Sequence, residues 1–177
     1  MIEGQAAERF LAAPLLAGVD LEARRAVLEC LREGGAREGA LLLEQDHPND
    51  RLSILIEGTA VVERTYPGGR KEVLASLTAP AVFGTTSFFG PNPSSVAVRA
   101  TSDVAVLTLD HPSHERLRRA NPRAAEALAL AVVRVLAERF DMLDKRVTES
   151  LAEQEHDHPK MTEWSGFRAR LFEESSL

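Results

Sequence analysis

The sequence has only one cysteine, one tryptophan and one tyrosine among its 177 residues. The lone Cys30 excludes an internal disulfide and indicates a reducing compartment, the cytoplasm. No apolar run approaches the roughly 20 residues of a membrane-spanning helix, and the N-terminus lacks the basic and apolar segments of a signal peptide. Basic residues are also scarce, since 21 Lys and Arg face 27 Asp and Glu, for a net charge of −6. We therefore expect a cytoplasmic protein without membrane contact or direct DNA binding.

The sequence also shows no recognisable set of catalytic residues. No Ser–His–Asp set and no paired carboxylates stand out, so the sequence predicts no enzyme activity. His156 and His158 have a spacing found in metal ligands, but their polar surroundings favour a solvated linker. We expect no metal and no resident cofactor.

What is present is an ordinary globular composition, with 44% apolar and 27% charged residues, enough for one domain with a core. Residues 5–33 have a helical pattern, with Asp20 as a candidate N-cap and Gly34–Gly35 as the stop. From about residue 36 the sequence pattern changes to short apolar runs separated by residues that favour turns. The sequence thus predicts an N-terminal helical segment over 1–35 and a β domain over 36–110.

Helical patterns return after residue 110. The residues HPSHERLRRA, 111–120, predict a short helix, and Asn121 and Pro122 are an N-cap and a first helical residue for a long one. Residues 122–154 would extend roughly 50 Å at about 1.5 Å per residue. An apolar stripe along this helix predicts pairing with a second copy of the chain. Its expected dimer-interface residues are Val132, Leu136, Phe140, Leu143 and Val147.

The stretch FGTTSFFGPNPSSVAVRA, residues 83–100, has the appearance of a phosphate-binding loop followed by a strand. It begins with a glycine turn and carries several hydroxyl side chains. Yet residues 83–98 include no Lys, Arg, Asp or Glu. The loop therefore has the frame of an anion site without the charges.

The order of these pieces resembles the cyclic nucleotide-binding domain of the catabolite activator (Crp/Fnr) superfamily. The resemblance covers roughly residues 15–150, and its most specific pieces are DRLSILIEGTAVV (50–62), PGGRKEVLASL (67–77), VFG (82–84), SSVAVRATSDVAVLTL (94–109) and NP (121–122). It implies an α+β, mainly β fold: a β jelly-roll with N-terminal helices and a long C-terminal dimerisation helix. It also implies a phosphate-binding cassette.

In this family the cassette has a Glu that holds the ribose 2′-OH and an Arg that pairs with the cyclic phosphate. Matched to that pattern, Gly84 is kept, Thr85 stands in place of the Glu, and Ser94 stands in place of the Arg. Each charge-assisted hydrogen bond is worth about 1.5–3 kcal/mol, so losing both costs about 3–6 kcal/mol, or roughly two to four decades of affinity. Impaired cyclic AMP binding is the expectation, with at most a weak nucleotide ligand.

If a ligand binds, the candidate residues combine the cassette with the long helix. The resemblance places Arg139 and Phe140 where the helix meets the purine. Arg139 either replaces the lost positive charge or pairs with neighbouring carboxylates. The full candidate set is Gly84, Thr85, Thr86, Ser87, Ser94, Ser95, Val96, Arg139 and Phe140.

The C-terminal region differs from that of transcription factors of this family. In those proteins, a winged helix-turn-helix domain comes after the long helix. About 23 residues follow Gln154, too few for that domain. Residues 155–177 form a tail whose Trp164, Phe167, Leu171 and Phe172 recur at helical spacing. The tail either docks an unidentified protein partner or covers an apolar patch of its own domain.

The sequence as a whole predicts a non-enzymatic, homodimeric signalling or adaptor protein that acts through protein contacts. Two alternatives remain. One is a sensor of a cyclic or modified nucleotide with a rebuilt pocket. The other is a transcriptional regulator that works through a partner.

Overall fold

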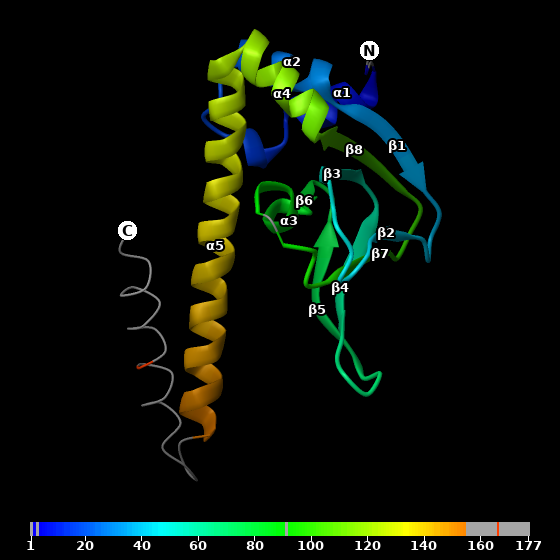
Figure 1. Ribbon diagram of the computed structural model, residues 1–177, viewed down its shortest axis with the longest axis vertical. Coiled ribbons are helices and arrows are strands. Elements are labelled where there is room, and N and C mark those ends of the chain that lie inside the picture. The colour runs from blue at the N-terminus through cyan, green and yellow to red at the C-terminus, as the bar shows by residue number, and fades with distance from the viewer. Residues whose placement is uncertain (1, 3, 91, 155–165, 167–177) are drawn as a thin grey trace. The chain divides into compact units, whose positions relative to one another are not determined.

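The computed structural model describes residues 2, 4–90, 92–154 and 166 (Figure 1). The chain divides into two compact units, Met1–Val133 and Arg134–Leu177. The first unit holds the N-terminal helices, the strands, helices α3 and α4 and the beginning of α5. The second holds the remaining turns of α5.

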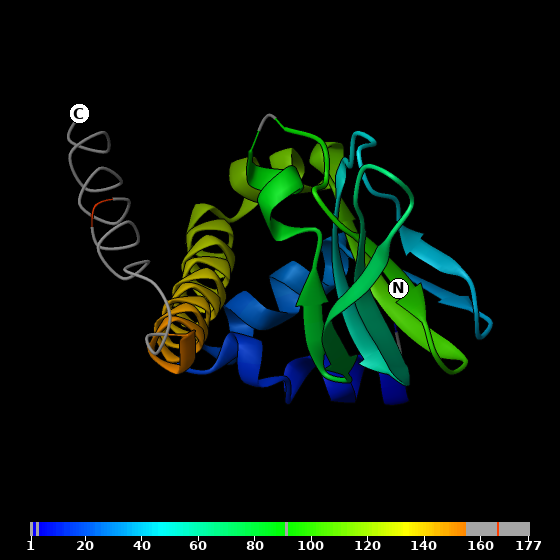
Figure 2. The ribbon, with the colours of Figure 1, turned by 90° about the horizontal axis from the view of Figure 1, so that it is seen from below.

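Three short helical segments begin the chain: α1 (Gln5–Leu11), the 3-10 helix η1 (Pro14–Leu16) and α2 (Leu21–Cys30). Asp20 is the N-cap of α2, as predicted, because its Oδ1 accepts the Ala23 N–H at 2.7 Å. Seen from below, these helices lie beside the strands (Figure 2).

The predicted end of the helical segment was wrong. Helix α2 ends at Cys30, and the glycines expected to stop it lie inside strand β1, Arg32–Ala36. Strand β1 pairs with β8 from Arg32↔Thr108 to Ala36↔Val104. This pairing satisfies the backbone polar groups of Gly34 and Gly35, which have no side chains to pack. The β domain therefore begins at Arg32 rather than at residue 36.

Within the described residues, the strands form two four-stranded antiparallel sheets, ordered β1-β8-β3-β6 and β2-β7-β4-β5. The other strands are β2 (Leu41–Leu43), β3 (Arg51–Glu57), β4 (Thr59–Thr65), β5 (Lys71–Thr78), β6 (Ala81–Phe83), β7 (Ala97–Ala100) and β8 (Val104–Asp110). The two sheets and their flanking helices confirm the expected α+β jelly-roll.

The predicted PGG hairpin joins β4 to β5. Thr65 pairs with Lys71, and the Tyr66 N–H donates to the Arg70 carbonyl at 2.9 Å. Gly68 and Gly69 both have positive φ, 90° and 82°, which explains why two glycines stand at this tip.

Apolar side chains fill both faces of the β1-β8-β3-β6 sheet. The interior of the roll is built from Leu43, Leu55, Ala60, Phe83, Val98, Ala100, Val104 and Val106. Because strand side chains alternate, Ile54 and Leu107 point to the opposite face, yet both are fully buried. Helices α1 and α4 contact β3 and β8, so this face forms a second core under the helices.

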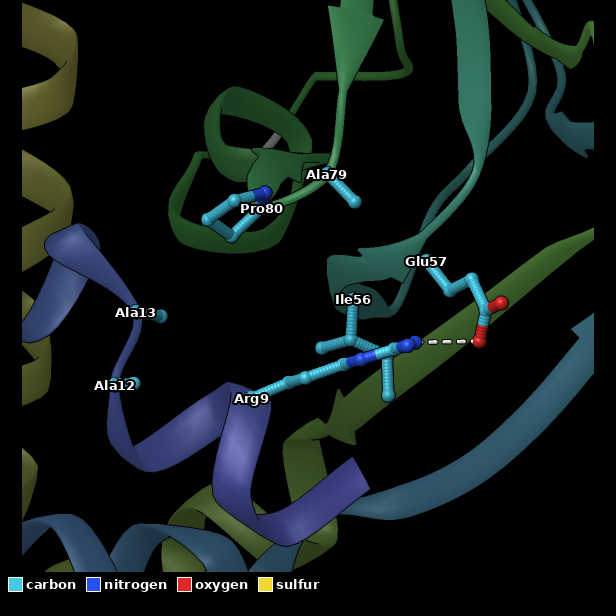
Figure 3. A pocket seen from close by; sticks show the side chains of 7 residues that line it. All are labelled: Arg9, Ala12, Ala13, Ile56, Glu57, Ala79 and Pro80. Atoms are coloured by element: carbon cyan, nitrogen blue, oxygen red, sulfur yellow. Dashed lines mark hydrogen bonds and ion pairs between the residues drawn. The ribbon is translucent and has the colours of Figure 1, made fainter. Parts of the chain in front are cut away.

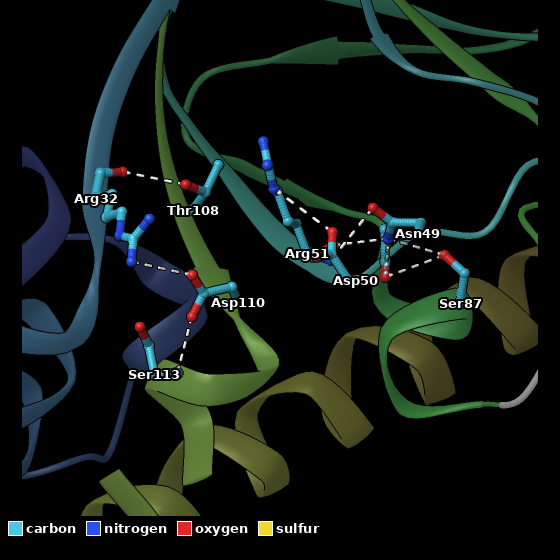
Figure 4. A network of polar contacts seen from close by, with 9 residues as sticks. Arg32, Asn49, Asp50, Arg51, Ser87, Thr108, Asp110 and Ser113 are labelled. Atoms are coloured by element: carbon cyan, nitrogen blue, oxygen red, sulfur yellow. Dashed lines mark hydrogen bonds and ion pairs between the residues drawn. The ribbon is translucent and has the colours of Figure 1, made fainter. Parts of the chain in front are cut away.

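Two capped helices follow the roll. Asp110 is the N-cap of α4 (His111–Ala120), with its Oδ1 accepting the Ser113 N–H at 2.8 Å and its Oδ2 3.3 Å from an Arg32 nitrogen (Figure 4). Asn121 Oδ1 accepts the Ala124 N–H at 3.0 Å, and α5 runs over Pro122–Gln154, the bounds expected from the sequence.

Candidate functional site

The loop singled out in the sequence forms a turn, a short helix and an extended return. Strand β6 ends at Phe83, Gly84 turns the chain, and α3 covers Thr85–Phe89 before the chain reaches β7. Gly84 has φ +75°, and a Cβ there would lie 2.7 Å from the Arg51 carbonyl oxygen. Only glycine fits this position without strain. We call residues 84–96 the cassette.

The two positions expected to hold charged anchors are buried and already hydrogen-bonded or packed. Thr85 is 2% exposed and Ser94 is 3% exposed. The Ser94 hydroxyl donates to the Val96 carbonyl at 2.8 Å, within the cassette itself. Neither side chain offers a charge for a phosphate or a ribose.

The other predicted cassette residues differ in exposure. Thr86 and Ser95 are exposed, Val96 is half-buried and Ser87 is buried. Among the predicted hydroxyl-bearing residues of the cassette, only Thr86 and Ser95 are exposed. The prediction that these residues bind a ligand remains a prediction.

Asn49 was missed by the sequence analysis, although it contacts the cassette directly. Its Nδ2 donates to the Ser87 hydroxyl at 3.0 Å and to the Arg51 carbonyl at 2.7 Å, with a longer contact of 3.4 Å to the Gly84 carbonyl (Figure 4). Asn49 stands in the turn-forming sequence HPND, which marks a loop but gives no sign of a contact 35 residues away.

An aromatic cluster connects the cassette to α4. The buried Phe88 ring stacks on His111, and the Phe88 and Phe89 rings both meet His114 edge-on at 5.6 and 5.8 Å. Burial lowers the pKa of His114, with the positive charge of Arg118 acting in the same direction. The neutral imidazole is the form that this packing favours.

Arg139 and Phe140 belong to the second unit, so the expectation that they line the cassette remains a prediction. Burial lowers the pKa of the Arg139 guanidinium, which has such a high ordinary pKa that it stays charged. Phe140 is 51% exposed.

One residue of the predicted dimer stripe is buried within its own subunit. Val132 is 1% exposed and belongs to the core of the first unit, while the stripe as a dimer interface stays a prediction. The apolar residues left exposed at this level of α5 are Leu130 and Val133, at 53% and 58%. Farther along, Leu143 is exposed, while Leu136 and Val147 are half-buried. The tail residues Trp164, Phe167, Leu171 and Phe172 lie outside the described residues.

A pocket of about 550 Å³ is lined by residues outside the cassette (Figure 3). Arg9 and Glu57 form an ion pair at it, and its other lining residues are Ala12, Ala13, Ile56, Ala79 and Pro80. None of the predicted site residues lines it.

The described residues lack two kinds of functional feature. No cluster of three or more His, Cys, Asp or Glu side chains is placed to hold a metal ion in that part of the chain. Nor does any helix there combine the length and the apolar character needed to cross a membrane.

Burial raises the pKa of the Cys30 thiol, which disfavours the reactive thiolate.

Comparison with known proteins identifies the roll. The family model described as the cyclic nucleotide-binding domain matches residues 36–121, from β1 through the cassette to the end of α4. The N-terminal domain of a transcriptional regulator from Streptomyces coelicolor A3(2) is 30% identical, with a TM-score of 0.64, covering 76% of this chain and 94% of that one. The chain belongs to the cyclic nucleotide-binding domain family.

Two further similar proteins are named as an activator and as a regulator. The catabolite activator protein of Thermus thermophilus is 26% identical with a TM-score of 0.64, over 76% of this chain and 63% of that chain. A CRP-like cAMP-activated global transcriptional regulator of Mycobacterium tuberculosis is 27% identical over 141 residues, which is 80% of this chain. The chain spans 59% of the length of that curated relative.

Proposed function

We propose that this member of the family is a non-enzymatic regulatory module that acts through protein contacts and does not hold cyclic AMP in the family's usual manner. The observation that carries the proposal is the pair Thr85 and Ser94. These are the positions at which the family pattern has its charged anchors, and here both are buried, neutral side chains. With residues 83–98 free of charged side chains, nothing in the cassette neutralises a phosphate.

The energetic consequence is large compared with the affinity of an ordinary signalling site. Two lost charge-assisted hydrogen bonds amount to about 3–6 kcal/mol. A micromolar site would then bind in the millimolar range or more weakly. The backbone N–H groups and exposed hydroxyls of the cassette do not compensate for a loss of that size.

The module works as a homodimer in this proposal, because α5 leaves apolar side chains without cover in a single subunit. Leu130 and Val133 are exposed at the end of the first unit, and Phe140, Met142 and Leu143 are exposed in the second. Exposed apolar side chains along a long helix favour pairing with another helix. The dimer would present protein-binding surfaces to a partner in the cytoplasm.

A second function deserves testing because the family match extends over the whole cassette. In this alternative the domain senses a cyclic or modified nucleotide through the hydroxyls of the cassette and the charge of Arg139. The name of the Mycobacterium tuberculosis relative, a cAMP-activated regulator, supports a nucleotide ligand in this branch of the family.

Restoring the anchors tests the proposal directly. The double variant Thr85→Glu, Ser94→Arg is titrated calorimetrically with cyclic AMP beside the wild-type chain. We expect the variant to gain affinity by about a hundredfold or more, in line with two recovered charge-assisted bonds. The matched control is Thr86→Glu, Ser95→Arg, which adds the same charges at the adjacent exposed positions and gains nothing. Wild-type affinity equal to that of the restored variant would contradict the proposal.

A further inference from the structure

The loop between β2 and β3 contacts the cassette at both of its ends. Near the beginning of the cassette, the Asn49 amide donates to the Ser87 hydroxyl at 3.0 Å and approaches the Gly84 carbonyl at 3.4 Å. Near its end, the Asp46 N–H donates to the Ser94 carbonyl at 2.7 Å, and the Ser94 N–H donates to the His47 carbonyl at 3.2 Å. We call residues 45–49 the strap.

The strap also contacts the β4–β5 hairpin at Thr65, the last residue of β4. Strand β7 pairs with β4 only as far as Glu63↔Ala97. Beyond that point the Gln45 side chain takes its place, because its amide donates to the Thr65 carbonyl at 2.9 Å and accepts the Thr65 N–H at 2.7 Å. This pair of bonds reproduces the exchange that a neighbouring strand residue would make.

The strap therefore bonds to the beginning of the cassette, to Ser94 near its end and to Thr65 of β4. In this arrangement the separation between positions 85 and 94 is set by a loop that lies outside the cassette. The strap thus contacts the described cassette on both sides of residue 91, at Ser87 and at Ser94.

We propose that Asn49 is a positioning residue, and that the strap holds helix α3 and Ser94 in place without a ligand. The contact at Gly84 supports this assignment, since a Cβ on Gly84 would lie 2.9 Å from Asn49 Nδ2. The close packing of residue 84 and the amide of residue 49 leaves little freedom between them. The inference rests on the proposed function and deepens it, because it names the groups that hold α3 and Ser94 when charged anchors are missing.

Hydrogen–deuterium exchange of the full chain without ligand tests the proposal. The reporters are the Phe88 N–H, bonded to the Gly84 carbonyl at 3.0 Å, and the Gly90 N–H, bonded to the Thr86 carbonyl at 2.8 Å. Asn49→Asp keeps an acceptor for the Arg51 N–H, which Asn49 Oδ1 now accepts at 3.3 Å, but replaces the cassette donor with a carboxylate. We expect these amides to exchange about tenfold faster in Asn49→Asp, with Ser87→Ala having a smaller effect in the same direction.

The exchange experiment distinguishes a role of Asn49 in positioning the cassette from a role confined to its own turn. If Asn49 only shapes its own turn, Asn49→Asp leaves the exchange of α3 unchanged, and the proposal is overturned. Gln45→Ala is the matched control, because it should speed exchange at Thr65 and the hairpin while leaving Phe88 and Gly90 unaffected. Should Asn49→Asp fail to fold, unchanged α3 exchange in Ser87→Ala would overturn the proposal by itself.

A second measurement keeps this inference apart from the proposed function. Asn49→Asp is added to the restored variant Thr85→Glu, Ser94→Arg, and we expect its affinity for cyclic AMP to fall by about tenfold. If the restored variant gains no affinity at all, the proposed role of positions 85 and 94 fails, while the exchange experiment still decides whether the strap holds the cassette.

Discussion

Phe88 of the cassette lies flat on His111, the first residue of α4, with ring centroids 4.4 Å apart and 7° between the ring planes. Helix α3 is therefore packed against the helix that leads directly into α5. His114 meets the same Phe88 ring edge-on, one turn farther along α4. A change in the cassette that moves Phe88 would therefore disturb its packing against the first turns of α4.

The stability of this cluster should depend on pH. Because burial lowers the pKa of His114 in the folded chain, the folded state binds fewer protons than the unfolded state near pH 6. Stability is then complete above the ordinary His pKa of about 6.5 and falls as the pH drops below it. Chemical denaturation between pH 7 and pH 5 should show this loss in the wild type and a smaller loss in His114→Phe. Equal losses in the two proteins would exclude His114 as the cause.

Gly84→Ala should destabilise the protein more than an alanine at another positive-φ glycine. Left-handed backbone costs a non-glycine residue about 1–2 kcal/mol, and the new Cβ would also lie 2.7 Å from the Arg51 carbonyl oxygen. Gly68→Ala is the matched control, since Gly68 has φ +90° but nothing within 4 Å of the added carbon. Urea unfolding of both variants measures the difference, and equal losses would show that crowding at residue 84 adds nothing.

The N-cap of α4 can be tested with two substitutions at one position. Asp110→Ala removes the acceptor for the Ser113 N–H and should cost about 1 kcal/mol; Asp110→Asn keeps the acceptor and should cost less. Hydrogen bonds from Ser113 lower the pKa of Asp110. The carboxylate's contribution is therefore present at neutral pH and is lost as the pH falls below about 4. Thermal unfolding at pH 7 ranks the variants, and a loss in Asp110→Asn as large as in Asp110→Ala would argue against the cap.

Two adjacent valines of α5 should behave in opposite ways. Val133 is 58% exposed, so Val133→Glu should weaken dimer formation without affecting the stability of one subunit. Val132 is buried in its own core, and Val132→Ala should cost about 1–3 kcal/mol of stability. Analytical ultracentrifugation and urea unfolding separate the two effects. A dimer that withstands Val133→Glu would place the interface elsewhere.

Local signals in the sequence were sufficient for much of the fold. The caps at Asp20 and Asn121 and the PGG turn each depend on residues within four positions of one another, so the pattern of the chain reveals them. The α5 bounds followed from Asn121–Pro122 and from apolar periodicity. The jelly-roll followed from the resemblance, whose pieces are spread along the chain.

What the sequence could not supply were contacts between distant segments. Asn49 and Ser87 meet only because β3 and β6 are paired, and nothing in either neighbourhood indicates the other. Periodicity placed Val132 on an apolar stripe of α5, but it could not tell whether that position lies in the subunit's own core or on its surface. The same limit explains the error at β1. Gly34 and Gly35 were predicted to end a helix, but they lie in a strand because β1 pairs with the distant strand β8.

Isothermal titration of the wild-type chain with cyclic AMP, carried into the millimolar range, tests the central claim most directly. A cassette whose two anchor positions are Thr85 and Ser94 should give no saturable heat below about 1 mM, in line with the loss of two charge-assisted bonds. A saturable isotherm with a micromolar Kd would contradict the account and would show that other groups hold the phosphate.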